Sequence, residues 1–550
     1  MDKIWLKHYP TSIPHEIPPI DKDIVTLFLE ACQEFETQPA FRSFDRGLSY
    51  GKLKQLSFHL ASELQNQGLK TGDKIIIQLP NILQYPVSLW ASLLSGLTVV
   101  NMNPLYTSRE MLHQIKDSGA KAIILLSSSA KKLEEIIDQT DLKTVIITKP
   151  GDLLGRLKRP IVNFVFKYIQ KKSPSYNLAN SLSFLKALAR GSQKQPQIFK
   201  RDLDETLFIQ YTGGTTGTSK GACLSQKNIL SNLKQCELWL TPSLERGKER
   251  VLSPLPLYHI FSFLVNGLLL FLYGAENILI ADPRQFQKLI NTMKKYPVST
   301  GVGVNSLFKA LLQRPSLRQL DFSKCKFFVA GGMSLEPSVQ KQWKELTGVP
   351  IIEGYGLTEA SPVVCCNSLQ NPEEEGHIGF PLPSTEIRII NEQGTEQPIG
   401  KEGELEVRGP QVMQGYYQKA QETKNVFQNG WLKTGDIALI NEKGLIKIKD
   451  RKKDMIIVSG FNVYPNEVEE VINLHEAVRE SAVVGKQNAS SVNEEVKAFV
   501  VKKELSLTEE DLKLHCRKLL APYKIPKTIE FVENIPKTNI GKPLRRAFKN

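Results

Sequence analysis

The sequence has few cysteines, and none of them stands at a metal-binding spacing. Its seven cysteines are scattered over 550 residues. They include no C-x-x-C pair. An odd, scattered set favours reduced thiols in the cytoplasm over a disulfide framework, and it offers no zinc site. Zinc-finger spacings and basic helices with interleaved aromatic residues are also missing, so no nucleic-acid partner is expected.

Long hydrophobic runs are missing as well. The longest, such as residues 264–273, fall well short of the roughly 20 residues that a membrane-spanning helix needs. The start, MDKIWLKHYP, lacks the apolar core of a signal peptide. We therefore expect a cytoplasmic protein that touches a membrane at most peripherally. Positive charge is in excess, because 71 Lys and Arg face 57 Asp and Glu, and a net charge of +14 suits anionic partners such as nucleotides, CoA and acidic lipid.

A Walker P-loop is absent, although one stretch has the composition of a phosphate-binding loop. In LFIQYTGGTTGTSKGACL, residues 207–224, an apolar strand breaks into a loop rich in glycine and hydroxyl groups. Its lysine is preceded by Ser219 and followed by Gly221, which does not fit G-x4-G-K-[ST]. Glycines let backbone N–H groups turn toward an anion, and hydroxyls with one ammonium complete the cradle. The predicted phosphate-binding residues are Tyr211, Thr212, Gly213, Gly214, Thr215, Thr216, Gly217, Thr218, Ser219, Lys220 and Gly221.

The order of patterns along the chain predicts an α/β fold in two parts. Helical runs alternate with short apolar strands from residue 48, as in a parallel sheet covered by helices. Short strands and turns over 386–449 indicate a smaller β-rich subdomain of a large domain, 1–449. An α+β unit follows at 450–550, with a hinge at 450–454.

The loop YTGGTTG-x-x-KG resembles the phosphate loop of the adenylate-forming (acyl-activating) superfamily, which includes acyl-CoA synthetases, luciferases and peptide-synthetase adenylation domains. YGLTE, 355–359, matches the superfamily too. There Tyr355 would offer its ring to adenine, Thr358 would bind phosphate, and Glu359 would be an oxygen ligand for Mg2+, with Thr212 beside it. Glu359 is thus a predicted catalytic and metal-binding residue.

Three further stretches carry the same resemblance. In 429–456 it implies that Asp436 accepts hydrogen bonds from the ribose, that Arg451 reaches the same ribose, and that Lys453 is the hinge residue. In VSGFNVYPNEVEE, 458–470, the resemblance implies candidate contacts with CoA for Gly460, Phe461, Asn462 and Tyr464. In IPKTNIGKPLRR it makes Lys542 the catalytic lysine that meets the carboxylate and the α-phosphate. One lysine of some relatives is replaced here by Ile457, so its contacts do not carry over.

The acyl group has a less distinct signature. Tyr258 and His259 precede a long apolar helix, and small residues stand where a tunnel could run. The predicted acyl pocket is Tyr258, His259, Gly301, Gly303, Gly331 and Gly332. Glycines in apolar strands also mark close packing, so both interpretations stay open.

From WLKHYP to GKPLRR, the whole chain resembles bacterial long-chain fatty acid–CoA ligases. The resemblance implies ATP-dependent ligation of a medium- or long-chain fatty acid to CoA through an acyl-adenylate, releasing AMP and pyrophosphate, with Mg2+ as cofactor. The resemblance is compatible with a homodimer but does not decide the oligomeric state. The alternatives are a fatty acyl-AMP or acyl-carrier-protein ligase, and a catalytically silent lipid- or nucleotide-binding regulator.

Residues 156–172, RLKRPIVNFVFKYIQKK, differ from the rest of the chain. Basic residues flank apolar and aromatic ones, and the segment contains no acid. Such a basic amphipathic segment suits the anionic inner face of a membrane. The alternative is a surface helix whose apolar side packs on the body of the protein.

Overall fold

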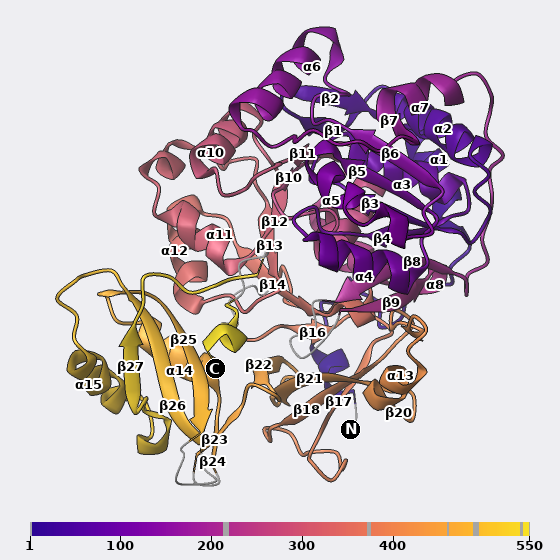
Figure 1. The fold of residues 1–550 in the computed structure, drawn as a ribbon. Helices are drawn as coiled ribbons and strands as arrows, with labels where there is room; N and C mark the ends of the chain where they lie inside the picture. The colour runs from indigo at the N-terminus through magenta and orange to yellow at the C-terminus, as the bar shows by residue number, and fades with distance from the viewer. Residues whose placement is uncertain are drawn as a thin grey trace.

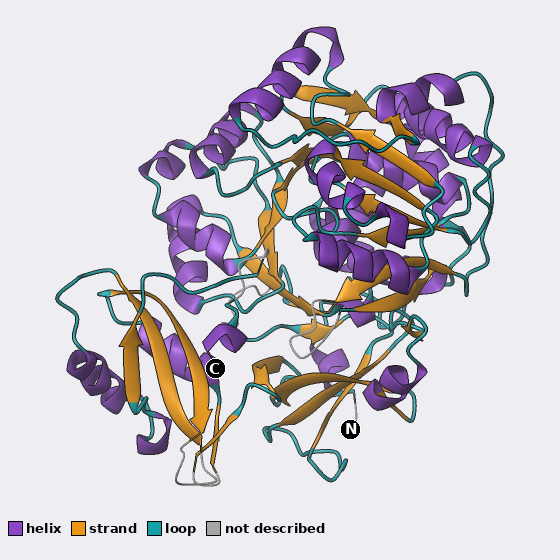
Figure 2. Cartoon of the chain, viewed as in Figure 1, coloured by secondary structure: helices purple, strands orange, loops and turns teal. Residues whose placement is uncertain are grey.

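Two mostly parallel sheets build the upper part of the molecule in Figures 1 and 2. The computed structural model describes residues 3–212, 219–370, 376–458, 461–487, 494–538 and 543–548. The first sheet runs, in order, β19 (Gly415–Tyr416), β9 (Lys220–Ser225), β8 (Thr206–Thr212), β4 (Thr98–Asn101), β3 (Lys74–Gln78), β5 (Ala122–Leu126), β6 (Thr144–Thr148) and β7 (Ser181–Ser183). The β8–β9 and β9–β19 pairs are antiparallel, and the other described strands of this sheet pair in the parallel sense.

The second sheet lies beside the first and ends in antiparallel strands. Its order is β16 (Phe380–Pro381), β15 (Val363–Cys366), β14 (Ile351–Gly356), β13 (Phe327–Gly331), β12 (Thr300–Gly303), β10 (Arg250–Ser253), β11 (Glu276–Leu279), β1 (Pro39–Ser43) and β2 (Arg46–Ser49). Strands such as β5 and β13 are buried along their whole length. Because both faces are covered, these strands appear in the sequence as continuous apolar runs.

Helices cover these sheets and fill the space between them. Those of the large part are α1 (Ile24–Glu34), α2 (Tyr50–Asn66), α3 (Gln84–Leu94), α4 (Ser108–Ser118), α5 (Ala130–Glu134), α6 (Gly155–Phe164), α7 (Phe184–Gly191), α8 (Gln226–Leu240), α9 (Ile260–Ser262), α10 (Phe286–Lys295), α11 (Asn305–Leu312) and α12 (Pro337–Thr347). Every residue of α3 is buried. Its Tyr85 hydroxyl lies 2.8 Å from Asn101 Oδ1 on the first sheet and 2.8 Å from the Leu257 carbonyl after β10 of the second, so α3 ties the two sheets together.

A β-rich sheet follows, coloured orange in Figure 1. It comprises β17 (Glu386–Ile390), β18 (Gly403–Arg408), β21 (Trp431–Ile440), β20 (Phe427–Gln428) and β22 (Ile446–Arg451), with helix α13 (Ala420–Val426) beside it. The C-terminal unit, at the lower left of Figure 1, contains β23 (Ile456–Val458), β24 (Phe461–Val463), α14 (Pro465–Asn473), β25 (Val478–Gln487), β26 (Glu494–Lys502), α15 (Glu509–Leu519) and β27 (Thr528–Phe531). Val468, Val483 and Leu512 belong to a hydrophobic core of this unit that is separate from the large one.

The described helices include none that combines the length and the apolarity needed to cross a bilayer.

Candidate active site

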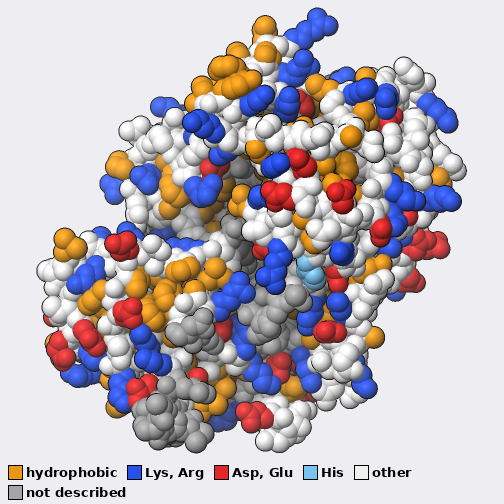
Figure 3. Space-filling model, in the orientation of Figure 1, with side chains coloured by type: hydrophobic (Ala, Val, Ile, Leu, Met, Phe, Trp, Pro, Cys, Tyr) orange, Lys and Arg blue, Asp and Glu red, His pale blue; other side chains and the backbone are white. Residues whose placement is uncertain are grey.

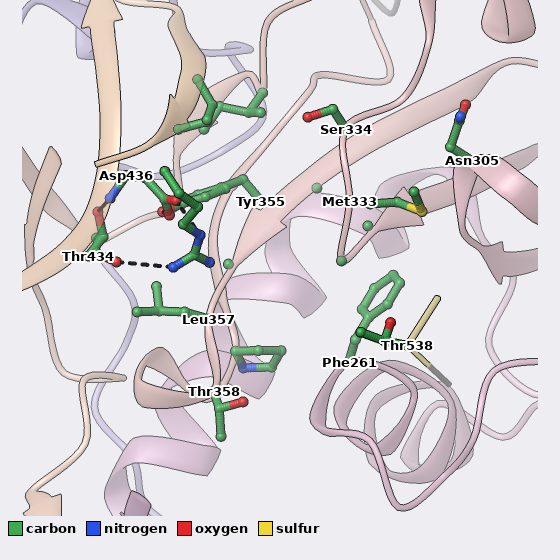
Figure 4. A pocket seen from close by; sticks show the side chains of 18 of the residues that line it. Phe261, Asn305, Met333, Ser334, Tyr355, Leu357, Thr358, Thr434, Asp436 and Thr538 are labelled. Carbon is green, nitrogen blue, oxygen red and sulfur yellow. Dashed lines mark hydrogen bonds and ion pairs between the residues drawn. The ribbon is translucent and has the colours of Figure 1, made fainter. Parts of the chain in front are cut away.

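A cleft of about 2030 Å3 lies where the large part meets the C-terminal unit. Strands β13 and β14 of the second sheet lead into it with their carboxyl ends, the edge at which α/β sheets usually bind ligands. The β-rich sheet contributes Asp436 and Arg451, and the C-terminal unit contributes Thr538 and Arg545. Figure 4 shows Tyr355, Thr434 and Asp436 on one side of the pocket, with Phe261, Met333 and Asn305 across from them.

The predicted phosphate loop joins two paired strands at the edge of this cleft. Gly213, Gly214, Thr215, Thr216, Gly217 and Thr218 lie outside the described residues. At the base of the loop, Thr212 on β8 stands opposite Lys220 on β9, and both line the cleft. The Lys220 ammonium lies 5.2 Å from the centre of the Tyr416 ring, so a cation borders the cleft at the loop base.

Side chains of α4 hold this hairpin in place. The Tyr211 hydroxyl donates to Asp117 Oδ2 at 2.7 Å, and His113 Nε2 lies 3.1 Å from the Ser219 carbonyl oxygen. Helix α4 is itself fixed at its N-terminus by a capping box between Thr107 and Glu110. Gly221 cannot be larger, because an added Cβ would stand 2.4 Å from Ile209 Cγ2.

Glu359 presents a carboxylate to the cleft just after strand β14. Its Oε1 accepts a hydrogen bond from the Tyr416 hydroxyl at 2.7 Å, and its backbone carbonyl accepts one from Met413 N at 2.7 Å. Thr358 also lines the cleft. Mg2+ is commonly held by one or two carboxylates together with substrate phosphates and waters. The single carboxylate of Glu359, near the predicted phosphate loop, fits that donor set.

Asp436, Arg451 and Tyr355 form one hydrogen-bonded group in the wall of the cleft. Asp436 on β21 stands opposite Arg451 on β22, and Arg451 Nε lies 2.7 Å from Asp436 Oδ1. The Tyr355 hydroxyl donates to the other carboxylate oxygen, Oδ2. Arg451 Nη1 also donates to the Thr434 carbonyl at 3.4 Å.

Burial and neighbouring charges shift the pKa values of this group. Burial acts to lower the pKa of Arg451, but the neighbouring groups Asp436, Tyr355, Glu359 and Asp454 together outweigh it and raise that pKa above its ordinary value. Burial and the Asp436 carboxylate raise the pKa of the Tyr355 hydroxyl. Tyr355 therefore stays a protonated donor at neutral pH, and the group presents an ionised acceptor that suits the hydroxyls of a ribose.

Part of the predicted acyl pocket lies in the cleft, and part does not. Tyr258, His259, Gly331 and Gly332 line it. Burial lowers the pKa of His259 to about 4, so this imidazole is neutral at physiological pH.

Gly301 and Gly303 are not among the residues that line the cleft. An added Cβ at Gly301 would lie 2.9 Å from Leu252 Cβ, and one at Gly303 would lie 2.5 Å from Phe308 Cζ. Strand β12 is an inner strand with neighbours on both sides, so its glycines permit close packing in the core.

Several lining residues carried no signal in the sequence. Cys236, Trp239 and Leu240 of α8, with Phe261 and Val265, give the cleft an apolar wall. They belong to helices whose apolar residues could equally face the core, so only the packing reveals them.

Glu353 is a buried carboxyl that the sequence analysis also missed. It lines the cleft and accepts a hydrogen bond from Leu335 N at 3.1 Å. Burial raises its pKa to about 8, so the group is mostly protonated at neutral pH. An acid inside an apolar strand, directly before the GYG that leads into the YGLTE motif, is the signal that could have found it.

The predicted CoA-side residues lie apart from the cleft in this structure. Gly460 falls outside the described residues. Of the described members, Phe461, Asn462 and Tyr464, none lines the cleft. Phe461 stacks on Tyr523 with ring centres 4.8 Å apart, and the Tyr464 hydroxyl donates to Glu402 at 2.8 Å. Lys453 lines the cleft, and Lys542 lies outside the described residues.

Two family models match this chain. A model described as "AMP-binding enzyme" covers residues 28–417, and one described as "AMP-binding enzyme C-terminal domain" covers 467–542. The chain belongs to the AMP-binding enzyme family. Known family members resemble it over their whole length. Long-chain-fatty-acid–CoA ligases of Escherichia coli O6:H1 and Haemophilus influenzae are 46% and 43% identical to it, and each alignment covers 100% of this chain and 98% of the relative.

Solved structures of other proteins share the fold. ATP-bound MatB from Rhodopseudomonas palustris superposes with a TM-score of 0.82 at 26% identity, covering 96% of this chain and 98% of that one. The anthranilate CoA ligase AuaEII in complex with anthranoyl-AMP gives a TM-score of 0.84 at 22% identity, covering 96% and 97%. The mixed α/β architecture, with its large N-terminal and small C-terminal parts, is thus that of adenylate-forming enzymes.

Proposed function

We propose that this AMP-binding enzyme ligates medium- or long-chain fatty acids to CoA through an acyl-adenylate, releasing AMP and pyrophosphate. The observation that carries the proposal is 46% identity over the full chain to long-chain-fatty-acid–CoA ligases. The cleft supports it, because a polar side with Asp436 for a ribose and Lys220 for phosphate adjoins the apolar wall formed by Trp239 and its neighbours. An aliphatic chain and a nucleotide would each meet suitable chemistry there.

The residues would divide the work over two steps. A fatty acid carboxylate oxygen attacks the α-phosphorus of ATP, which forms the acyl-adenylate and expels pyrophosphate. The CoA thiolate then attacks the acyl carbonyl, which forms the thioester and expels AMP. In the first step anion meets anion, so Lys220 and Lys542 would lower the repulsion while Asp436 and Arg451 hold the ribose. Glu359, with the Thr212 hydroxyl, would hold Mg2+, which neutralises phosphate charge when bound.

One incubation tests this function. Purified protein is supplied with ATP, Mg2+, CoA and a series of fatty acids from medium to long chain, and nucleotides and acyl products are identified by mass spectrometry. We expect AMP together with acyl-CoA. AMP or acyl-adenylate without acyl-CoA would identify an acyl-AMP or carrier-protein ligase. ADP would contradict the proposed chemistry, and no turnover would support the silent regulator.

We further propose that residues 156–172 bind an anionic lipid surface. Helix α6 continues as a π-helical turn, Val165–Ile169, and the two form a ridge at the top of Figure 3, where apolar and basic side chains lie together. Leu157 is 84% exposed and Ile161 is 64% exposed. Phe164, Tyr168 and Ile169 are exposed too. A soluble protein rarely leaves such a stripe without a partner. The exposed basic residues of the ridge are Arg156, Lys158, Arg159, Lys167, Lys171 and Lys172.

Charge reversal on this ridge should weaken lipid binding. Replacing Lys167, Lys171 and Lys172 by Glu is expected to lower affinity for anionic phospholipid vesicles by at least about 10-fold, because each basic side chain near such a surface contributes on the order of 1 kcal/mol. The measurement is co-sedimentation with vesicles of anionic and of neutral phospholipid at one ionic strength.

A matched control separates the ridge from the overall charge. Lys424, Lys503 and Lys518 are exposed lysines outside the ridge, and their replacement by Glu changes the net charge equally. Equal weakening by both triple variants would mean that the protein's general positive charge is responsible. Unchanged binding of the ridge variant would refute the proposal.

A further inference from the structure

Arg545 lies at the centre of a buried cluster of acidic and amide groups. Its side chain is 11% exposed, and its guanidinium makes two parallel contacts with Glu469, from Nε to Oε1 at 2.9 Å and from Nη2 to Oε2 at 2.8 Å. Nη1 lies 3.0 Å from Asp450 Oδ1 and 3.7 Å from Asp454 Oδ2, and Nη2 donates to Asn466 Oδ1. Two-point contacts of this kind fix the orientation of an arginine as well as its position.

Asp450 belongs to a different part of the molecule from Arg545. It lies on β22, opposite Ile437 of β21, and is therefore part of the β-rich sheet. Its side chain is only 1% exposed. The second carboxylate oxygen, Oδ2, accepts a hydrogen bond from Asn466 N at 2.7 Å, in the first turn of α14. An anion at a helix N-terminus is well placed electrostatically, so Asp450 holds both α14 and Arg545.

These contacts cross the proposed hinge. Asp450 precedes Lys453 in the chain, whereas Asn466 and Arg545 follow it. A rotation of the C-terminal unit about Lys453 would therefore carry Asn466 and Arg545 away from Asp450. The Glu469–Arg545 contacts lie within the C-terminal unit and would move with it.

The same contacts fix the tail that faces the cleft. Pro543 is bridged to Lys537, and Leu544 N donates to the Pro536 carbonyl at 2.8 Å. Lys537, Thr538, Pro543, Leu544 and Arg545 all line the cleft. Lys542, outside the described residues, directly precedes Pro543 in the chain.

We propose that the Asp450–Arg545 contact is a latch that holds the C-terminal unit in the orientation for adenylate formation. The inference rests on the proposed function, since it assigns this orientation to the first of the two steps. Asp450 and Arg545 are positioning residues that act through Lys542. The strength of the latch then sets how much of the enzyme is oriented for adenylation and how much is free to turn toward the second step.

Separate assays of the two steps test the latch. Asp450→Ala is expected to slow adenylate formation about 10-fold, which is within the usual range of coupling between two states, while supplied acyl-adenylate reacts with CoA at least as fast as in the wild type. Asp450→Asn keeps the size of the side chain and one acceptor oxygen, so its rate of adenylate formation should lie between those of the wild type and Asp450→Ala. Pyrophosphate exchange into ATP measures the first step, and thioester formation measures the second. Equal slowing of both steps would overturn the proposal.

A control and a second measurement exclude general loss of structure. Glu530→Ala removes the 2.7 Å Lys497–Glu530 ion pair within the C-terminal unit and should leave the ratio of the two rates unchanged. Spin labels at positions 424 and 518, which lie on α13 and α15, report the orientation directly. Asp450→Ala should add a second distance population, and a distribution identical to that of the wild type would overturn the latch. This measurement needs no turnover, so it distinguishes failure of the latch from failure of the proposed function.

Discussion

Lys542→Ala should slow adenylate formation by at least about 100-fold, the usual cost of removing a group that stabilises transition-state charge. The thioester step should survive, because a supplied acyl-adenylate no longer needs a cation at the α-phosphate. Pyrophosphate exchange measures the first step, and acyl-CoA formation from synthetic acyl-adenylate measures the second.

The control for this variant is a lysine of the same unit that pairs elsewhere. Lys527 is two-thirds exposed and contacts Glu495, so Lys527→Ala should leave both steps near wild-type rates. An equal loss of both steps in Lys542→Ala would contradict the division of labour between them.

Asp436→Ala should weaken ATP binding about 100-fold, because hydrogen bonds to a charged group contribute roughly 1.5–3 kcal/mol each. The substitution also leaves Arg451 without the carboxylate that stands opposite it. Because the Asp436 side chain is only 5% exposed and its loss leaves Arg451 without this partner, the melting temperature should fall as well. Calorimetric titration with ATP and thermal unfolding of the free protein measure the two effects.

Two further variants make the second test specific. Asp436→Asn keeps an acceptor for the ribose and should lose less affinity than Asp436→Ala. Glu442 is an exposed acid in a turn of the same sheet, and Glu442→Ala should change neither quantity. Unchanged ATP affinity in Asp436→Ala would remove Asp436 from the nucleotide site.

The large features of the fold follow from local patterns in the chain. Buried parallel strands appear as continuous apolar runs, and the segments around 75–77 and 122–126 are strands β3 and β5 for that reason. The β-rich stretch after 386 likewise forms the sheet of β17, β18 and β21.

Contacts between residues far apart in the chain could not be predicted from the sequence. Asp436 and Arg451 each matched a motif, yet their direct pairing depends on the register of β21 against β22. The hydrogen bond from Tyr355 to Asp436 joins residues 81 positions apart. Gly301 and Gly303 show a different limit, because a small residue in an apolar strand fits both a tunnel and a packed core. The sequence does not contain the close approach of Leu252 to Gly301 or of Phe308 to Gly303.

The separate hydrophobic core of the C-terminal unit bears on how such enzymes can be recombined. Val468, Val483 and Leu512 bury one another without help from the large core, so the unit carries its own folding information. A chimaera joined within residues 452–455 would leave both cores whole. In such a chimaera Asp450 would come from one parent enzyme and Arg545 from the other. The two parents would therefore be compatible only if both carry this pair of an acid and an arginine.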